Sequence, residues 1–128
     1  MQNGIGLLAS QMADARQVGV AYPEKVRLLR VQAIPIPDQP VLRAAAQTTN
    51  LISPATSGLT LRYGIFIRAD YWQDRYLVVH ELAHTAQYER LGGIQSFLAK
   101  YLHECITIGY PDAPMEQEAI EIAERICG

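Results

Sequence analysis

The sequence predicts one small α+β domain, covering residues 1–128, with a helical C-terminal half. Two observations predict this fold class. Segments rich in branched and aromatic side chains occur before residue 69, and such segments are typical of strands. From Asp74 onward, apolar residues recur at helical spacing in three successive stretches. With 128 residues, 49% of them hydrophobic, the chain is long enough to bury a core of its own.

The first part of the chain is predicted to form a helix and then a strand. Residues 5–18 carry apolar side chains at roughly helical spacing, which indicates an amphipathic helix. Residues 26–34 are rich in branched side chains and indicate a strand. The proline-rich run 35–40 should end this strand, because proline has no N–H group to donate to a neighbouring strand.

The middle of the chain is predicted to contain a short helix and two extended segments. The helix covers residues 40–49, and a loop over residues 53–58 follows it. Residues 59–63 and 65–68 are extended segments separated by Gly64. They form either a tight hairpin or one bent strand, and the sequence leaves both arrangements open.

Three helices are predicted in the C-terminal half, over residues 74–91, 94–108 and 114–127. A pair of glycines separates the first two helices, and a turn rich in glycine and proline separates the last two. Acidic side chains gather at this end of the chain, where residues 112–128 carry a local net charge of −4.

The composition argues against several classes of protein. The net charge of −2 provides no electrostatic footprint for nucleic acid or an anionic membrane. The N-terminus lacks the features of a secretory signal, and no window holds the roughly 20 apolar residues that span a bilayer, so we expect a cytoplasmic protein. Cys105 and Cys127 are expected to remain unbridged, because two antiparallel helices would hold them about 18 Å apart.

One motif points to chemistry, and it lies in the first of the three C-terminal helices: His80-Glu81-x-x-His84. Residues four apart on a helix lie one above the other, so the two imidazoles can bind one metal ion. Glu81 points about a quarter-turn away, where its carboxylate can deprotonate a water molecule on the metal. At this chain's composition, the pattern arises by chance in roughly 0.4% of sequences.

The surroundings of this motif favour a metal ion over a purely structural role. On a helical wheel, both faces of residues 74–91 are largely apolar, as is typical of a buried central helix. Two histidines and a carboxylate inside such a helix need polar partners, and a metal ion would supply one. The alternative is that His80 and His84 are core histidines bonded to carbonyl groups or to Tyr88.

A catalytic zinc site needs a third protein ligand, for which the downstream candidates are Glu104, Glu116, Glu118 and His103. In the last helix Glu116 lies closest to the apolar stripe and Glu118 lies further round. In the preceding helix Glu104 lies about 90° from the apolar stripe and His103 lies opposite it. Glu116 is therefore the predicted ligand. Alternatively, Glu116 is an acid in the first turn after Pro114, stabilised there by the helix dipole.

The motif together with the stretch 116–119 (Glu-Gln-Glu-Ala) resembles the zincin metallopeptidases. Within them it is similar to the gluzincins, especially the small minigluzincins and the Ste24-type and HtpX-type proteases. Their third ligand lies in a Glu-x-x-Ala-Asp stretch. The resemblance implies that His80, His84 and Glu116 bind one Zn²⁺ and that Glu81 is the general base.

The resemblance has one departure and one extension. Ile120 stands where the family has an aspartate that supports a ligand histidine, so the residues behind the ligands must differ in this chain. Residues 64–68 are similar to the strand at the edge of a zincin cleft, where an extended substrate adds by backbone pairing. Before residue 59 the resemblance is close to absent.

Three more residues are candidates for the site. Gln87 lies two turns after His80 on the same helical face, and is either a contact of the metal's ligands and water or a plain surface amide. Tyr101 and Tyr110 are candidates for stabilising an oxyanion, although the chain contains seven tyrosines.

The sequence thus predicts a zinc metallopeptidase domain, with one Zn²⁺ as cofactor and a peptide or protein as substrate. The rival hypothesis is a zinc-stabilised interaction module without turnover, which the small size favours because 128 residues leave little wall for a cleft. A third hypothesis is a protein without any metal.

Overall fold

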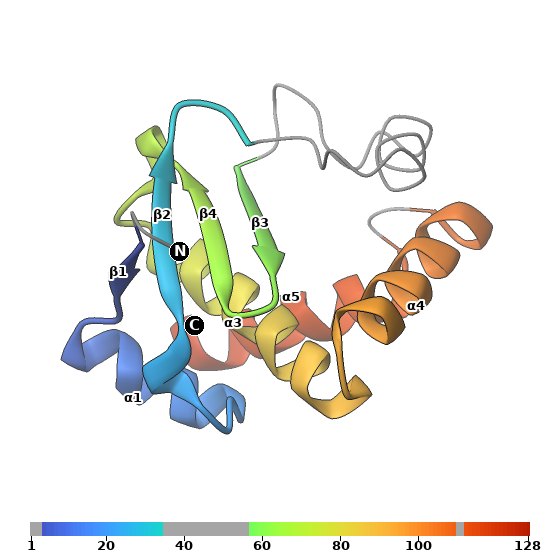
Figure 1. Cartoon of the computed structure of the whole chain (residues 1–128), viewed down its shortest axis with the longest axis horizontal. Coiled ribbons are helices and arrows are strands. Elements are labelled where there is room, and N and C mark those ends of the chain that lie inside the picture. The colour runs from blue at the N-terminus through green and yellow to red at the C-terminus, as the bar shows by residue number, and fades with distance from the viewer. Residues whose placement is uncertain (1–3, 35–56, 110–111) are drawn as a thin grey trace.

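The computed structural model describes residues 4–34, 57–109 and 112–128, and its secondary structure confirms the α+β class (Figure 1). The elements in chain order are β1 (Ile5–Gly6), α1 (Ala9–Val18), β2 (Arg27–Val31), β3 (Gly58–Leu61), β4 (Gly64–Arg68), α3 (Arg75–Leu91), α4 (Ile94–Thr107) and α5 (Pro114–Cys127), with short 3-10 turns at Pro23–Lys25 and Ala69–Tyr71. Within the described ranges, no helix is long and apolar enough to cross a membrane.

The four described strands form one mixed sheet in the order β1-β2-β4-β3. Strands β2 and β4 are parallel, whereas β1 pairs with β2 and β3 pairs with β4 in antiparallel fashion. The segments on either side of the turn before Gly64 therefore form a hairpin, not one bent strand. In this turn Arg62 adopts a φ of 58°, in the left-handed region.

The predicted helix over residues 5–18 is wrong at its N-terminal end. The helix begins at Ala9, and Ile5–Gly6 instead pairs with β2. Gly4 permits this segment to approach β2 closely, because a Cβ atom at this position would lie 2.6 Å from the Cβ atom of Arg27. The side chain of Gln11 then accepts a hydrogen bond from the Leu8 amide at 2.8 Å and marks the start of the helix.

Strand β2 is shorter than the strand predicted over residues 26–34. Its last residue, Val31, pairs with Arg68, the last residue of β4, so the chain beyond Val31 has no partner in β4. The proline-rich run 35–40, the helix expected over 40–49 and most of the loop expected over 53–58 lie outside the described residues.

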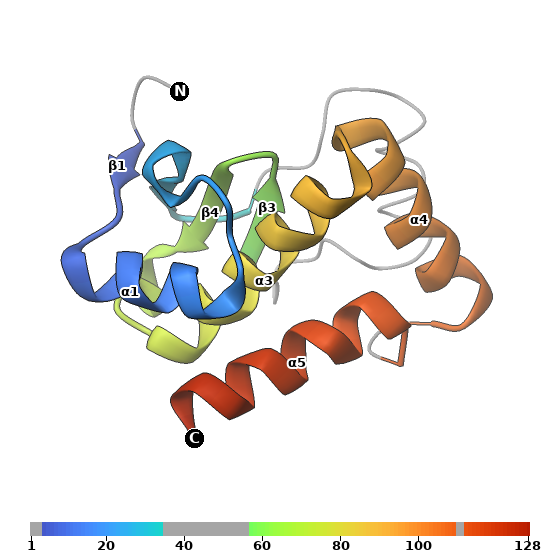
Figure 2. The ribbon, with the colours of Figure 1, turned by 90° about the horizontal axis from the view of Figure 1, so that it is seen from below.

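Helix α3 lies between the sheet and α5 (Figure 2). Ile65 and Ile67 of β4 point toward α3 and are fully buried. Every side chain of α3 from Val78 to Gln87 is buried except that of His80, which confirms the predicted buried central helix. The three predicted C-terminal helices are confirmed to within a residue at each end, and Cys105 and Cys127 are free thiols, as expected.

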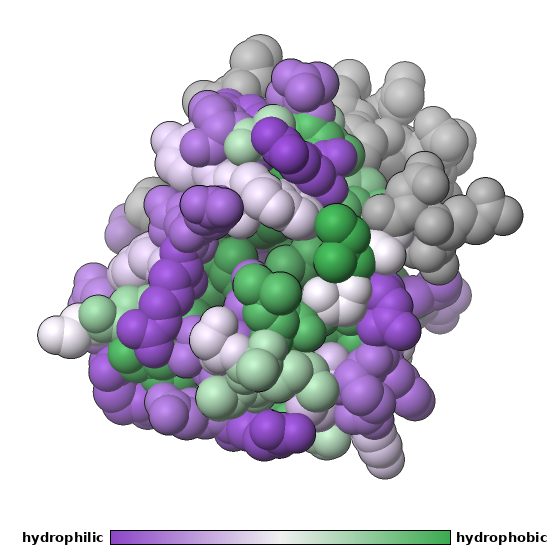
Figure 3. Space-filling view, turned by 90° about the vertical axis from the view of Figure 1, so that its left-hand side faces the viewer, coloured by the Kyte–Doolittle hydropathy of each residue, from purple (hydrophilic) through white to green (hydrophobic). Residues whose placement is uncertain are grey.

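A hollow of about 420 Å³ lies on the face formed by β1, α1 and the start of α3 (Figure 3). Apolar side chains such as Leu28 and Trp72 line it, together with the ion pair between Asp14 and Arg75. None of the residues of the histidine motif contributes to its lining. This hollow is therefore separate from the histidine motif.

Candidate metal centre

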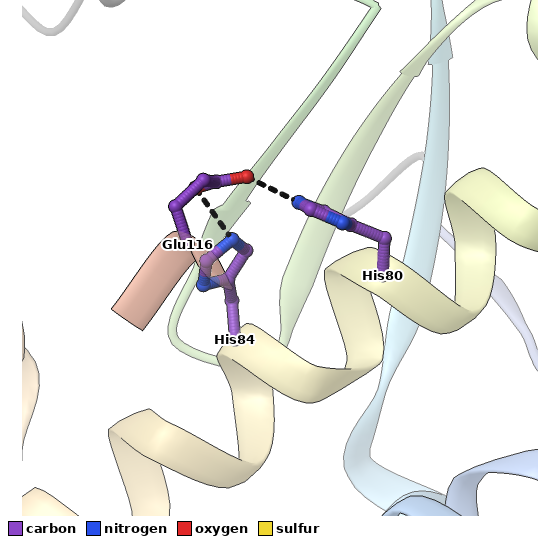
Figure 4. A group of neighbouring side chains, drawn as sticks. All are labelled: His80, His84 and Glu116. Carbon is purple, nitrogen blue, oxygen red and sulfur yellow. Dashed lines mark hydrogen bonds and ion pairs between the residues drawn. The ribbon is translucent and has the colours of Figure 1, made fainter. Parts of the chain in front are cut away.

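Helix α3 presents the two histidines of the motif side by side. Asp74 caps the start of the helix, its side chain accepting a hydrogen bond from the Leu77 amide at 3.0 Å. One turn separates His80 from His84, and the centroids of their rings are 5.1 Å apart. Both imidazoles point toward the first turn of α5 (Figure 4). The regular backbone of α3 thus orients the imidazole rings of His80 and His84 in the same direction.

Glu116 is the acidic residue that meets these histidines. Pro114 is the first residue of α5, where its fixed φ suits a helix start, and Glu116 follows in the same turn with 2% of its surface exposed. One carboxylate oxygen lies 2.5 Å from Nε2 of His80, and the other lies 3.2 Å from Nε2 of His84. One ligand atom from each of the three residues lies within 4.8 Å of the others.

The other candidate ligands lie elsewhere. Glu104 is buried, but its carboxylate accepts a hydrogen bond from the Met115 backbone amide at 2.7 Å and pairs with Lys100. Glu118 bonds to Gln87 and Arg90, and His103 is exposed. Among the described residues, His80, His84 and Glu116 are the one group of three such side chains whose ligand atoms lie close enough together that they could hold a metal ion.

The charges of this group depend on one another. Burial would raise the pKa of Glu116, but its hydrogen bonds to His80 and His84 hold that pKa well below its ordinary value. Burial would lower the pKa of His84, but the hydrogen bond to Glu116 and the nearby Glu81 raise it from 6.5 to about 9. Without a metal, a proton on His84 thus compensates the buried carboxylate.

Tyr101 extends the group from α4. Its hydroxyl donates a hydrogen bond to Glu116 at 2.7 Å, and its ring lies edge-on to that of His84 with centroids 5.4 Å apart. Burial raises the pKa of Tyr101, and the neighbouring Glu116 raises it further, so the hydroxyl remains a donor. The structure therefore places Tyr101 at the site, whereas Tyr110 lies outside the described residues.

Glu81 is supported from the sheet by residues that the sequence pattern does not predict. Its side chain is 5% exposed, and the Thr60 hydroxyl donates to one carboxylate oxygen at 2.7 Å. A Cβ atom at Gly58 would lie 3.2 Å from the other carboxylate oxygen. The two-residue period of a strand places Gly58 and Thr60 on one face, but nothing in the sequence indicates that this face meets Glu81.

The strand that contacts the motif helix at Glu81 differs from the strand that the resemblance implies. Residues 64–68 were expected to form an edge strand, but β4 lies between β2 and β3 in the sheet. Among the described strands, β3 is the edge strand next to β4, and Thr60 of β3 contacts Glu81. The reason is that β4 pairs with β3 through the hairpin and also pairs with β2, so it has a neighbouring strand on both sides.

Gln87 is not a plain surface amide, because its side chain is fully buried. Its oxygen lies 2.8 Å from Nδ1 of His84, the ring nitrogen that faces away from Glu116. Its nitrogen donates to the Met115 carbonyl and to Glu118, both at 2.9 Å. Gln87 therefore connects the second histidine of the motif to α5.

The donor atoms suit zinc. Two imidazole nitrogens and a carboxylate oxygen are a ligand set of catalytic zinc sites, in which tetrahedral bonds of about 2.1 Å separate neighbouring ligand atoms by about 3.4 Å. In this structure one oxygen of Glu116 lies 2.5 Å from Nε2 of His80 and the other lies 3.2 Å from Nε2 of His84, and one ligand atom from each residue lies within 4.8 Å of the others. Comparisons of this chain with models of protein families, with curated proteins and with solved structures found no match.

Proposed function

We propose that this chain is a zinc-dependent metallopeptidase domain of the gluzincin type. One observation carries the proposal: His80 and His84 converge with Glu116, from a different helix, and Glu81 follows His80 directly in the sequence. Two histidines, a carboxylate ligand and a carboxylate base next to the first histidine are the combination used by zinc peptidases with a His-Glu-x-x-His motif. The substrate would be a peptide or a protein.

The proposed roles follow from the positions of the side chains. His80, His84 and Glu116 would hold one Zn²⁺, which when bound supplies a Lewis acid that polarises the scissile carbonyl and makes water more acidic. Glu81 would accept the proton of the attacking water and pass it to the leaving amine. Thr60 would keep the Glu81 carboxylate in one orientation, because its hydroxyl already donates to it at 2.7 Å.

Replacing Glu81 by glutamine tests this mechanism. The variant should bind one zinc per chain, measured by elemental analysis, because Glu81 is not among the three ligands. Hydrolysis of a mixed peptide library should fall by about 10²- to 10⁴-fold, the usual contribution of a general base. Glu121→Gln, an exposed change on α5, serves as the matched control and should leave both measurements unchanged. A Glu81→Gln variant that cleaves as fast as the wild type would refute the mechanism.

A non-catalytic, zinc-stabilised module is the second candidate, and the burial of Glu81 favours it. A carboxylate that is 5% exposed and bonded to Thr60 also suits a structural role. In this case wild-type protein binds zinc but cleaves no peptide, hydroxamates do not compete for an open metal position, and removal of zinc unfolds the chain.

A further inference from the structure

The amide of Gln87 can adopt only one orientation. Its nitrogen faces the Met115 carbonyl and the Glu118 carboxylate, and both of these groups accept hydrogen bonds but cannot donate them. Turning the amide over would place its oxygen against two acceptors. The oxygen of Gln87 is therefore held toward Nδ1 of His84, at 2.8 Å.

This orientation decides which nitrogen of a neutral His84 carries the proton. An amide oxygen only accepts, so Nδ1 must be the donor. The lone pair then lies on Nε2, the nitrogen that faces Glu116 at 3.2 Å. A ligand histidine needs this tautomer, because the metal binds the lone pair on the nitrogen that faces it.

The hydrogen bonds continue from Gln87 to the surface. The same oxygen of Glu118 accepts from Gln87 and from Arg90, the latter at 2.6 Å. The side chains of Arg90 and Glu118 are 60% and 42% exposed. An ion pair in contact with solvent is thus linked to His84 through one buried amide.

We propose that Gln87 is a positioning residue that fixes the tautomer of His84 for metal binding, and that Glu118 fixes the orientation of Gln87. The proposal rests on the proposed zinc site. In the proteases that this chain resembles, an aspartate after the third ligand supports a ligand histidine, but this chain has Ile120 at that position. Under the proposal, Gln87 on the motif helix provides this support instead.

Zinc affinity, measured by competition with a chelator, tests the chain of hydrogen bonds. Gln87→Met, similar in length but without donor or acceptor, should weaken zinc binding by about 10- to 100-fold. Glu118→Ala should weaken it less, because the Met115 carbonyl still holds the amide. Glu121→Ala, an exposed change on the same helix, should leave the affinity unchanged. If Gln87→Met does not fold, Glu118→Ala at its half-exposed position still provides the test.

NMR of the zinc-loaded protein labelled with ¹⁵N in its histidines separates positioning from a merely structural role. In the wild type, His84 should carry a slowly exchanging proton on Nδ1 and bind zinc through Nε2. In Gln87→Met this proton should exchange faster with water. A structural role alone would lower the melting temperature but change neither this signal nor the zinc affinity.

The possible failures are distinguishable. If the wild type and Gln87→Met bind zinc equally tightly, the inference about Gln87 is wrong but the proposed zinc site stands. The same holds if His84 binds zinc through Nδ1. A wild-type protein that binds no zinc overturns the proposed function and this inference together.

Discussion

At the scale of single residues, the site consists of one buried carboxylate between two imidazoles. Glu116 has 2% of its surface exposed, and a carboxylate so deeply buried requires positive or polar partners. Nε2 of His80, Nε2 of His84 and the hydroxyl of Tyr101 provide them. The residues that would bind zinc therefore bind one another in its absence, and a metal ion must compete with a proton for His84.

This competition predicts that zinc binding releases a proton. The pKa of His84 is raised from 6.5 to about 9, so at pH 7 the metal-free imidazole is protonated, and zinc requires its lone pair. The apparent zinc affinity should rise by about tenfold per pH unit between pH 6 and 8 through this group alone. Calorimetric titrations at pH 7 in buffers of different ionisation enthalpy measure the proton count. Heats that do not depend on the buffer would contradict the prediction.

At the scale of elements, the position of Glu116 depends on how α5 begins. Glu104, on α4, accepts a hydrogen bond from the Met115 backbone amide in the first turn of α5. Amides in the first turn of a helix have no partner within the helix, and this one is buried. The carboxylate of one helix thus fixes the start of the next, one residue before the candidate ligand.

Replacing Glu104 by alanine should therefore destabilise the fold and weaken the metal site. The variant leaves the Met115 amide unsatisfied, which costs about 1–3 kcal/mol of unfolding free energy, measured by urea denaturation without zinc. Zinc affinity should fall as well, because the first turn of α5 also carries Glu116. Glu104→Gln keeps an acceptor oxygen and is the matched control, with a smaller loss. Equal stability of Glu104→Ala and the wild type would show that the cap is not needed.

At the scale of the whole molecule, the candidate site joins two helices that are distant in the sequence. His80 on α3 and Glu116 on α5 are 36 residues apart, and α3 in turn packs on the sheet. A metal ion bound between them would connect the C-terminal helix to the core. Such a connection exists only in the folded chain, because the unfolded chain does not hold the ligands together.

Zinc should therefore stabilise the folded protein. At a free zinc concentration 100 times the dissociation constant, the gain is about 2.7 kcal/mol, seen as a higher melting temperature. His80→Ala should abolish this increase, whereas His103→Ala, at an exposed position on α4, should retain it. An equal increase in both variants would place the metal elsewhere.

The sequence by itself determined the features that depend on local geometry. The spacing of residues along one element predicts the three helices of the C-terminal half and the motif at 80–84. It also predicts the two extended segments around Gly64, and a hairpin was one of the two arrangements it allowed. The same spacing placed two imidazoles on one helical face. It also favoured Glu116, because Glu116 lies nearest to the apolar stripe of the last helix.

Only the tertiary structure decided which distant groups meet. It brought Glu116 to the histidines, Thr60 to Glu81 across 21 residues, and Gln87 to α5. It also gave Ile5–Gly6 to the sheet, against a local helical pattern. The physical reason is that side-chain periodicity is set within one element by short-range backbone geometry. The register between α3, β3 and α5 is instead set by how their surfaces pack together, which no local pattern contains.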